Sequence, residues 1–286
     1  MSEFVYKRFR KQEMELHFNP GGTVTDRERW TQERSKRSAA ARAALKSWLN
    51  VRYGPRPRQV LDIFPAARPD APVELFIHGG YWRSGSKDDY SFLASVLAPA
   101  GGLAVVIEYD LCPAVSVADI VEQARAAIAW TYGHIAEYGG DPAKIYLAGH
   151  SAGAHLAAMA LACDWAALGL PKDLIKGAAL ISGVYDPEPV LHLSVNEDIR
   201  LAPDSARRNS PMLHPPLSSA PLIIAVGGDE PEGWRQMSRE YFDLCRARGI
   251  DATYLEIPGA HHFSIPLLLA DPTTALARAL LGQMGL

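Results

Sequence analysis

Cysteine is scarce in this 286-residue chain, which has only Cys112, Cys163 and Cys245. Their number is odd, and their wide spacing forms neither a CxxC pair nor a Cys/His pattern of metal-ligand spacing. The sequence therefore argues against a disulfide framework and against a cysteine metal site. We expect all three to be reduced thiols in the core.

Long hydrophobic runs are also missing. No apolar segment approaches the roughly eighteen residues that a membrane span needs. The N-terminus, MSEFVYKRFRKQEMELHF, carries charge where a secretory signal would need a continuous apolar stretch. We therefore expect a cytoplasmic protein without a membrane partner.

The chain has no large excess of charge of one sign either. Its formal net charge of −3 offers no long-range attraction for nucleic acid, so none is expected as a partner. The first forty residues are locally basic, but acidic residues interleave them, which favours a solvated face. The basic residues in question are Lys7, Arg8, Arg10, Lys11, Arg27, Arg29, Arg34, Lys36 and Arg37.

Short apolar runs do alternate with amphipathic stretches along the whole chain. This alternation predicts an α/β fold in which a mostly parallel central sheet is flanked by helices. Strands are expected at 59–64, 74–77, 103–108, 144–148, 177–182, 222–226 and 253–257. Helices are expected at 28–49, 88–97, 117–138, 152–162, 234–248 and 272–284, the last capped by Asp271 with Pro272 in its first position.

Two segments depart from this rhythm. Residues 1–57 are expected to form a helical N-terminal extension to the main domain at 58–286. Residues from about 186 to 217 contain six scattered prolines, and we interpret them as a small cap inserted over the site, with a plain surface excursion as the alternative.

The segment Gly149-His150-Ser151-Ala152-Gly153 stands between a predicted strand and an alanine-rich helix. A serine hydroxyl becomes a useful nucleophile when a sharp strand-to-helix turn exposes it beside a base, which is the setting of GxSxG in α/β-hydrolases. Ser151 is therefore the candidate nucleophile. The backbone N–H of Ala152, at the start of the helix, is a candidate oxyanion donor.

His78-Gly79-Gly80 directly follows another predicted strand. Esterases of this fold place an H-G-G loop there to supply a second oxyanion donor, so we expect donors from Gly80 and Tyr81, with Gly79 in reserve. A plain glycine turn is the alternative. His78 is expected to shape the loop, while Tyr81 and Trp82 either line the substrate pocket or pack in the core.

Hydrolases of this fold order their triad as serine, acid, histidine. The turn Gly227-Gly228-Asp229-Glu230 ends a predicted strand, so Asp229 is the preferred acid, followed by Asp186 and then Glu230. The histidine is one of the adjacent pair His261 and His262. Neither a metal nor an organic cofactor is needed for this chemistry.

Eight segments recur in order over nearly the whole chain: HFNP near 17, HGGYWRSGSKDD from 78, IEYDLCP from 107, AGHSAGAHLAAM from 148, SGVYDPEPV from 182, NSPM from 209, GDEPEGWRQMSREY from 228 and GAHHF from 259. Together they resemble the kynurenine formamidase (arylformamidase) branch of the α/β-hydrolases and its carboxylesterase-like relatives. The resemblance implies that His262, before the phenylalanine, is the catalytic histidine and that Asp229 is the acid.

By the same resemblance, the reaction would be hydrolysis of N-formyl-L-kynurenine through a formyl-enzyme, with Tyr81 and Trp82 along the aromatic leaving group. Arg83 stands where some members carry a neutral side chain. The expected substrate is thus a small ester or aryl formamide. A general carboxylesterase and, more remotely, a non-catalytic binding protein of this fold are the alternatives, and the sequence leaves room for a homodimer.

Overall fold

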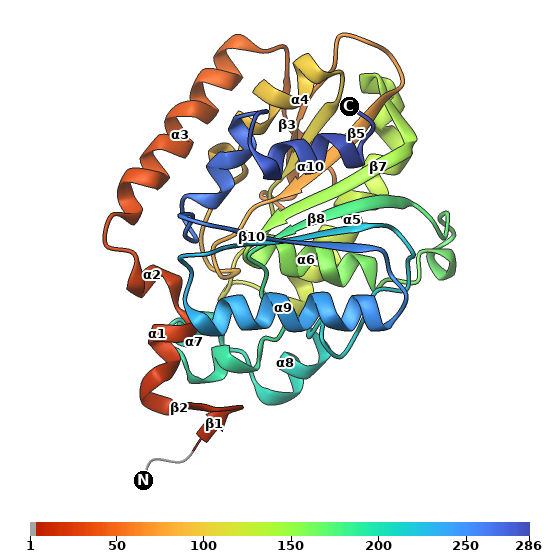
Figure 1. The fold of residues 1–286 in the computed structure, drawn as a ribbon. Helices are drawn as coiled ribbons and strands as arrows, with labels where there is room; N and C mark the ends of the chain where they lie inside the picture. Colours follow the sequence, from red (N-terminus) through yellow and green to blue (C-terminus); the bar gives the residue numbers. More distant parts are fainter. Residues whose placement is uncertain (1–3) are drawn as a thin grey trace.

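The computed structural model describes residues 4–286 and contains an eight-stranded sheet with helices on both faces (Figure 1). The strand order is β10-β9-β8-β7-β5-β6-β4-β3, and all neighbours from β6 to β10 are parallel, whereas β4 pairs antiparallel with β6 and β3. This confirms the predicted α/β class. The strands are β3 (Trp48–Arg52), β4 (Val60–Phe64), β5 (Ala71–Ile77), β6 (Leu103–Ile107), β7 (Gly140–His150), β8 (Ile175–Ile181), β9 (Leu222–Gly227) and β10 (Ala252–Ile257).

The larger helices lie close to their predicted positions. They are α3 (Arg27–Ala44), α4 (Ala94–Ala100), α5 (Val117–His134), α6 (Ala152–Leu161), α9 (Glu232–Ala247) and α10 (Ala275–Gln283). The last one starts later than expected, because Thr274 and not Asp271 caps it, accepting a hydrogen bond from the N–H of Ala277 at 3.2 Å. No helix among residues 4–286 is both long enough and apolar enough to cross a bilayer.

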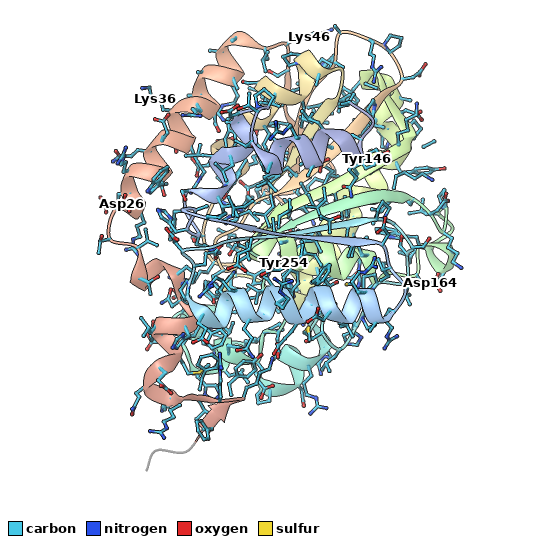
Figure 2. All side chains as sticks on the ribbon, in the orientation of Figure 1. Asp26, Lys36, Lys46, Tyr146, Asp164 and Tyr254 are labelled. Carbon is cyan, nitrogen blue, oxygen red and sulfur yellow. The ribbon has the colours of Figure 1, made fainter. Side chains whose placement is uncertain are left out.

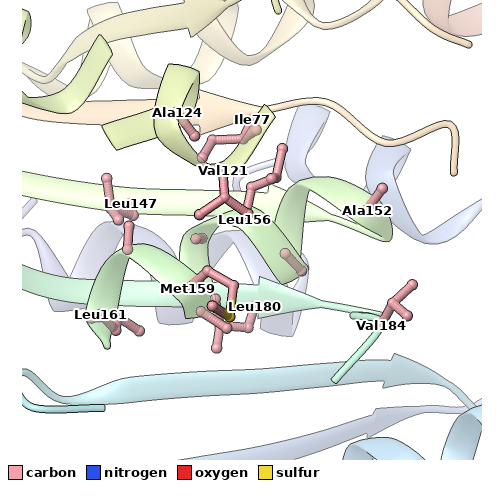
Figure 3. Close-up of a cluster of buried hydrophobic side chains, with 14 of the residues drawn as sticks. Ile77, Val121, Ala124, Leu147, Ala152, Leu156, Met159, Leu161, Leu180 and Val184 are labelled. Carbon is pink, nitrogen blue, oxygen red and sulfur yellow. The ribbon is translucent and has the colours of Figure 1, made fainter. Parts of the chain in front are cut away.

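Two apolar clusters hold the layers together, one on each face of the sheet. On one face α5, α6 and α9 pack on the strands, and Figure 3 shows Val121, Leu156 and Met159 among the buried side chains there. On the other face, Leu97 of α4 and Leu280 of α10 belong to the second cluster. Helix α5 buries one apolar stripe against the sheet, including Ile120, Ala124 and Ile128, whereas all ten residues of α6 are buried.

The parallel strands bring distant segments to one edge. The carboxyl ends of parallel strands lie at the same edge of a sheet, and ligands bind there in α/β folds. The loops after β5, β7, β8, β9 and β10 therefore converge, and each carries a residue that contributes to the site described below.

Residues 1–57 are less purely helical than expected, residues 1–3 lying outside the described part. Besides α1 (Met14–Phe18), α2 (Pro20–Thr23) and α3, this segment forms the hairpin strands β1 (Phe4–Tyr6) and β2 (Phe9–Arg10) and contributes β3 to the edge of the main sheet. The extension is therefore not helical throughout, and its last strand is part of the main sheet. Residues 186–217 contain two short helices, α7 (Asn196–Ile199) and α8 (Pro203–Arg208).

Candidate active site

Ser151 lies at a sharp turn between β7 and α6. Its backbone adopts φ 58° and ψ −121°, a conformation that non-glycine residues rarely take and that is held here because the Ser151 N–H donates to the Ile181 carbonyl at 2.8 Å. The turn presents the side chain to a pocket of about 750 Å³. The predicted strand-to-helix placement of this serine is thus what the backbone shows.

The two glycines of the motif are required by close packing. A Cβ at Gly149 would lie 2.4 Å from the backbone of Gly153, and a Cβ at Gly153 would lie 2.0 Å from the Ile77 carbonyl oxygen of β5. No real Cβ atom tolerates such distances, so only glycine lets α6 approach the sheet this closely. The motif therefore fixes the position of the serine through backbone contact.

His262 lies beside Ser151. Its Nε2 is 3.0 Å from the Ser151 Oγ, although 111 residues separate the two along the chain, and the His262 side chain is buried. The neighbouring His261 faces away: its Nδ1 accepts from the backbone N–H groups of Phe263 and Ser264, and its ring packs against Trp30. The loop after β10 thus places His262 and not His261 next to the serine.

The acid beside His262 is Glu230, so the expectation of Asp229 was wrong. The Oε2 atom of Glu230 lies 2.7 Å from the His262 Nδ1, whereas the Asp229 side chain is exposed. The backbone of Asp229 is held by an N–H bond to the Ala260 carbonyl at 2.9 Å, and this leaves its side chain outside. Asp186, the second choice, instead accepts a hydrogen bond from the Tyr6 hydroxyl at 2.8 Å.

Glu230 is locked by several donors. Its Oε1 accepts the backbone N–H of Gly227 at 2.9 Å and the Ser182 hydroxyl, and its side chain is fully buried. Trp234 packs edge-on against the His262 ring and donates its indole N–H to the Ser182 carbonyl at 2.8 Å. The sequence did predict the turn that delivers the acid. Choosing between Asp229 and Glu230 within that turn depends on side-chain length, because the longer glutamate side chain reaches back to the Gly227 N–H.

The loop after β5 lies against the serine. A Cβ at Gly79 would be 2.9 Å from the Ser151 Cβ, and Gly80 and Tyr81 both have positive φ values of 126° and 52°. Among residues 4–286, no protein acceptor binds the N–H groups of Gly80, Tyr81 or Ala152. Unpaired N–H groups beside a nucleophile are the arrangement that stabilises a developing oxyanion.

His78 holds the loop after β5 in place through both of its ring nitrogens. Its Nδ1 lies 2.8 Å from the Gly79 carbonyl and its Nε2 lies 2.8 Å from the Glu108 carboxylate, which Arg58 also contacts at 2.8 Å. Burial alone would raise the pKa of Glu108, but the hydrogen bond and charge of His78, together with Arg58, hold it at about 2. His78 therefore has the loop-shaping position expected of it.

The two aromatic residues after the glycines have different surroundings. Tyr81 lines the pocket, and its hydroxyl donates to the Phe18 carbonyl of the N-terminal segment. Trp82 is fully buried, and its indole N–H bonds to the His155 Nδ1 at 3.2 Å. The expectation that Trp82 lies along the substrate is therefore contradicted, because its ring fills the core below the loop.

His150 and Arg34 are pocket residues that the sequence did not point to. Burial, followed by the nearby His262 and Arg34, lowers the pKa of His150 well below its usual value, so the ring is neutral. Arg34 was expected on a solvated face, yet only 7% of it is exposed and it lines the pocket with Ser151 and His262. Periodicity alone could not reveal this, since the residue lies among exposed basic side chains of α3.

The described residues offer no cluster of three His, Cys, Asp or Glu side chains that could hold a metal ion. What the pocket does contain is a continuous chain of hydrogen bonds from a hydroxyl through an imidazole to a carboxylate. Such a chain can remove a proton from the hydroxyl and return it to a leaving group.

Known proteins resemble the chain in both sequence and structure. Residues 74–265 match the model of a family with the α/β hydrolase fold. The kynurenine formamidase of Danio rerio is 32% identical over 98% of both chains, and that of Salmo salar is 35% identical over 86% of this chain and 84% of its own. A crystal structure from Silicibacter sp. TM1040, provisionally assigned as a thioesterase, superposes with a TM-score of 0.80 at 26% identity, covering 94% of this chain and 97% of that one. The chain therefore belongs to the kynurenine formamidase family of α/β hydrolases.

Proposed function

We propose that this hydrolase cleaves aryl formamides, with N-formylkynurenine as the reference substrate, through a formyl-enzyme on Ser151. The observation that carries the proposal is the hydrogen-bonded series Ser151, His262 and Glu230, with distances of 3.0 and 2.7 Å. The names of the two fish relatives, which match most of the chain, supply the substrate class.

In the first half of the reaction, the Ser151 oxygen attacks the formyl carbon while His262 Nε2 takes the hydroxyl proton. Glu230 holds the Nδ1–H and stabilises the imidazolium. The N–H groups of Gly80, Tyr81 and Ala152 are the proposed donors to the oxyanion. The C–N bond then breaks, and the arylamine nitrogen leaves with the proton from His262.

The second half repeats these roles with water. His262 takes a proton from a water molecule as that water attacks the formyl ester, and the proton returns to Ser151 when the ester C–O bond breaks. The products are formate and the free arylamine, so both halves balance without any further reactant.

We also propose that residues 186–217 act as a cap. Ser194, Val195 and Glu197 line the pocket, and Asp198 of α7 forms an ion pair with Arg83 of the β5 loop at 2.6 Å. A cap tied to the oxyanion loop in this way would limit the length of the acyl chain that the pocket admits.

General carboxylesterase activity is the second candidate, since the same groups cleave activated esters and a thioesterase assignment accompanies the Silicibacter structure. The test is kcat/KM on N-formylkynurenine against p-nitrophenyl acetate. The formamidase proposal expects the formamide to be preferred, and negligible formamide turnover beside rapid ester cleavage would exclude it. Ser151→Ala should abolish both activities, and full retention of either would refute the serine mechanism.

A further inference from the structure

Arg34 is a charged pocket residue that the proposed mechanism does not use. A guanidinium keeps its charge at all ordinary pH values and carries five N–H donors. In Arg34, Nη1 donates to the Phe263 carbonyl at 3.3 Å, Nη2 donates to the Thr31 hydroxyl at 3.4 Å, and Nε has no partner. Both bonds are long and go to neutral oxygens, so most of its bonding capacity is unused.

No carboxylate among residues 4–286 lies within 4.0 Å of this guanidinium. The guanidinium also lies over the Tyr90 ring, 5.5 Å from the ring centroid. Asp89 also lines the pocket, but it accepts a hydrogen bond from the Ser35 hydroxyl. Buried charges are normally paired, because leaving water is costly without a counter-charge. An unpaired buried arginine beside an active site thus favours an anionic ligand.

The other two arginines that line the pocket, Arg83 and Arg27, are not both buried and unpaired as Arg34 is. Arg83 is already paired with Asp198 at 2.6 Å, and Arg27 is exposed and donates to the Gly21 carbonyl. The rings next to Arg34 add no charge of their own, since burial keeps Tyr90 protonated by raising its pKa and leaves His150 neutral by lowering its pKa. Arg34 is therefore the buried cation available to a ligand.

The position of Arg34 also indicates which half of the substrate it would meet. It hydrogen-bonds the backbone of Phe263, the residue after His262. His262 delivers its proton to the leaving nitrogen, so the leaving group must lie on this side of the Ser151 hydroxyl. The oxyanion loop at Gly79 and Gly80 lies against Ser151 itself.

We propose that Arg34 binds a carboxylate on the leaving group of the substrate and thereby selects aryl formamides that carry an acidic side arm. The inference rests on the proposed function and specifies its substrate class. In N-formylkynurenine, this group is the carboxylate of the amino-acid arm, which is attached to the ring carbon next to the formamido group. Arginine suits such a carboxylate because its planar fork can bind both oxygens.

The experiment compares kcat/KM for N-formylkynurenine and for N-formyl-2-aminoacetophenone, which has the same reacting group but neither the carboxylate nor the ammonium group of the amino-acid arm. Arg34→Gln should lower kcat/KM for the first by about 30- to 4,000-fold, the range expected for breaking a desolvated charge pair, and leave the second within about twofold. Arg34→Lys should restore part of the loss. An equal loss on both substrates would show that Arg34 is only structural and would overturn the proposal.

The matched control is Lys36→Gln, which removes one positive charge from the solvent-facing side of the same helix (Figure 2). Lys36→Gln should leave kcat/KM unchanged for both substrates. If Arg34→Gln fails to fold, the wild-type protein still provides the test, because the proposal requires it to prefer N-formylkynurenine over the neutral formamide. A wild-type enzyme that prefers the neutral compound, or treats the two alike, contradicts the proposal.

Failure of the formamidase function itself gives a different pattern. The enzyme would then cleave neither formamide, and the same comparison is made with two esters. Phenyl acetate has no acidic arm, whereas 3-(2-acetoxyphenyl)propanoate carries one on the ring carbon next to the ester. A selective Arg34→Gln loss on the second ester would support carboxylate binding in an esterase. Equal treatment of the two esters would overturn it.

Discussion

Replacing Glu230 with glutamine tests the acid assignment through a single oxygen-to-nitrogen exchange. In the wild-type protein, Oε1 accepts from both the Gly227 N–H and the Ser182 hydroxyl, while Oε2 faces the His262 Nδ1. The amide oxygen of the substituted side chain must take the Oε1 position to keep those two donors satisfied, so its NH₂ group points at Nδ1. The imidazole must then carry its proton on Nε2, facing Ser151.

A histidine with its proton on Nε2 cannot accept the serine proton. We therefore expect Glu230→Gln to reduce kcat by about 10⁴-fold, the loss seen when a triad carboxylate becomes an amide and fixes the wrong tautomer. At about 1.36 kcal/mol for each factor of ten, this is about 5.5 kcal/mol of transition-state stabilisation. Steady-state turnover of p-nitrophenyl acetate and N-formylkynurenine measures it, with far-UV circular dichroism to verify folding.

Asp229→Asn is the matched control, because it makes the same exchange one residue earlier on an exposed side chain. Its backbone bond to Ala260 is unchanged, so kcat should stay within about twofold, the equivalent of the half kcal/mol typical of surface substitutions. A large loss in Asp229→Asn together with near-normal Glu230→Gln would refute the reasoning.

Three further predictions concern stability. Gly153→Ala should destabilise the fold by about 1–3 kcal/mol or more, because its Cβ would meet the Ile77 carbonyl at 2.0 Å, whereas Gly133→Ala in α5, with no atom within 4 Å, should be neutral or stabilising in urea denaturation. Lys87→Met should cost about 3–5 kcal/mol, because the buried Asp62 loses its counter-charge at 2.9 Å and keeps only the N–H of Asn50. Lys144→Met, which breaks an exposed pair, should cost less than about 1 kcal/mol, and equal losses would contradict the argument. Burial raises the pKa of Glu74 well above its usual value and its Oε1 has no partner, so Glu74→Met should gain about 1–3 kcal/mol near pH 7. As pH rises, Glu74 ionises in the unfolded chain before it ionises in the folded protein, so the wild-type protein becomes progressively less stable above about pH 4.5. The gain in thermal unfolding temperature of Glu74→Met over wild type should therefore shrink toward pH 4.

Much of the fold was readable from the sequence because buried parallel strands are continuous apolar runs and helices bury one periodic stripe. In α5, for example, Ile120, Ala124 and Ile128 recur at helical spacing, and all three are fully buried. Strand β3 was missed for a physical reason. Leu45, Trp48 and Leu49 continue the apolar spacing of α3, but the helix ends at Ala44, and the half-exposed edge strand has no buried run to mark it.

In the site, too, some residues could be predicted from the sequence and others could not. Ser151 and the adjacent pair His261 and His262 could be predicted from local motifs, since glycines and the ends of predicted strands mark them in the sequence. The choice of Glu230 over Asp229 depends on how far a side chain curls back to Gly227, and the burial of Arg34 depends on which neighbours its helix meets. Both are properties of tertiary packing, so no one-dimensional pattern contains them.

The pocket draws on two separate stretches of chain. Ser151, Glu230 and His262 all lie within residues 74–265, the part that the family model matches, whereas Asn19, Gly22 and Arg34 come from before it. The residues proposed to break the bond thus lie within the matched region, whereas Arg34, proposed to bind the carboxylate, lies before it. Substitutions in the first forty residues can redirect which compounds are accepted while the reaction steps stay intact, so relatives that share the matched core need not share a substrate.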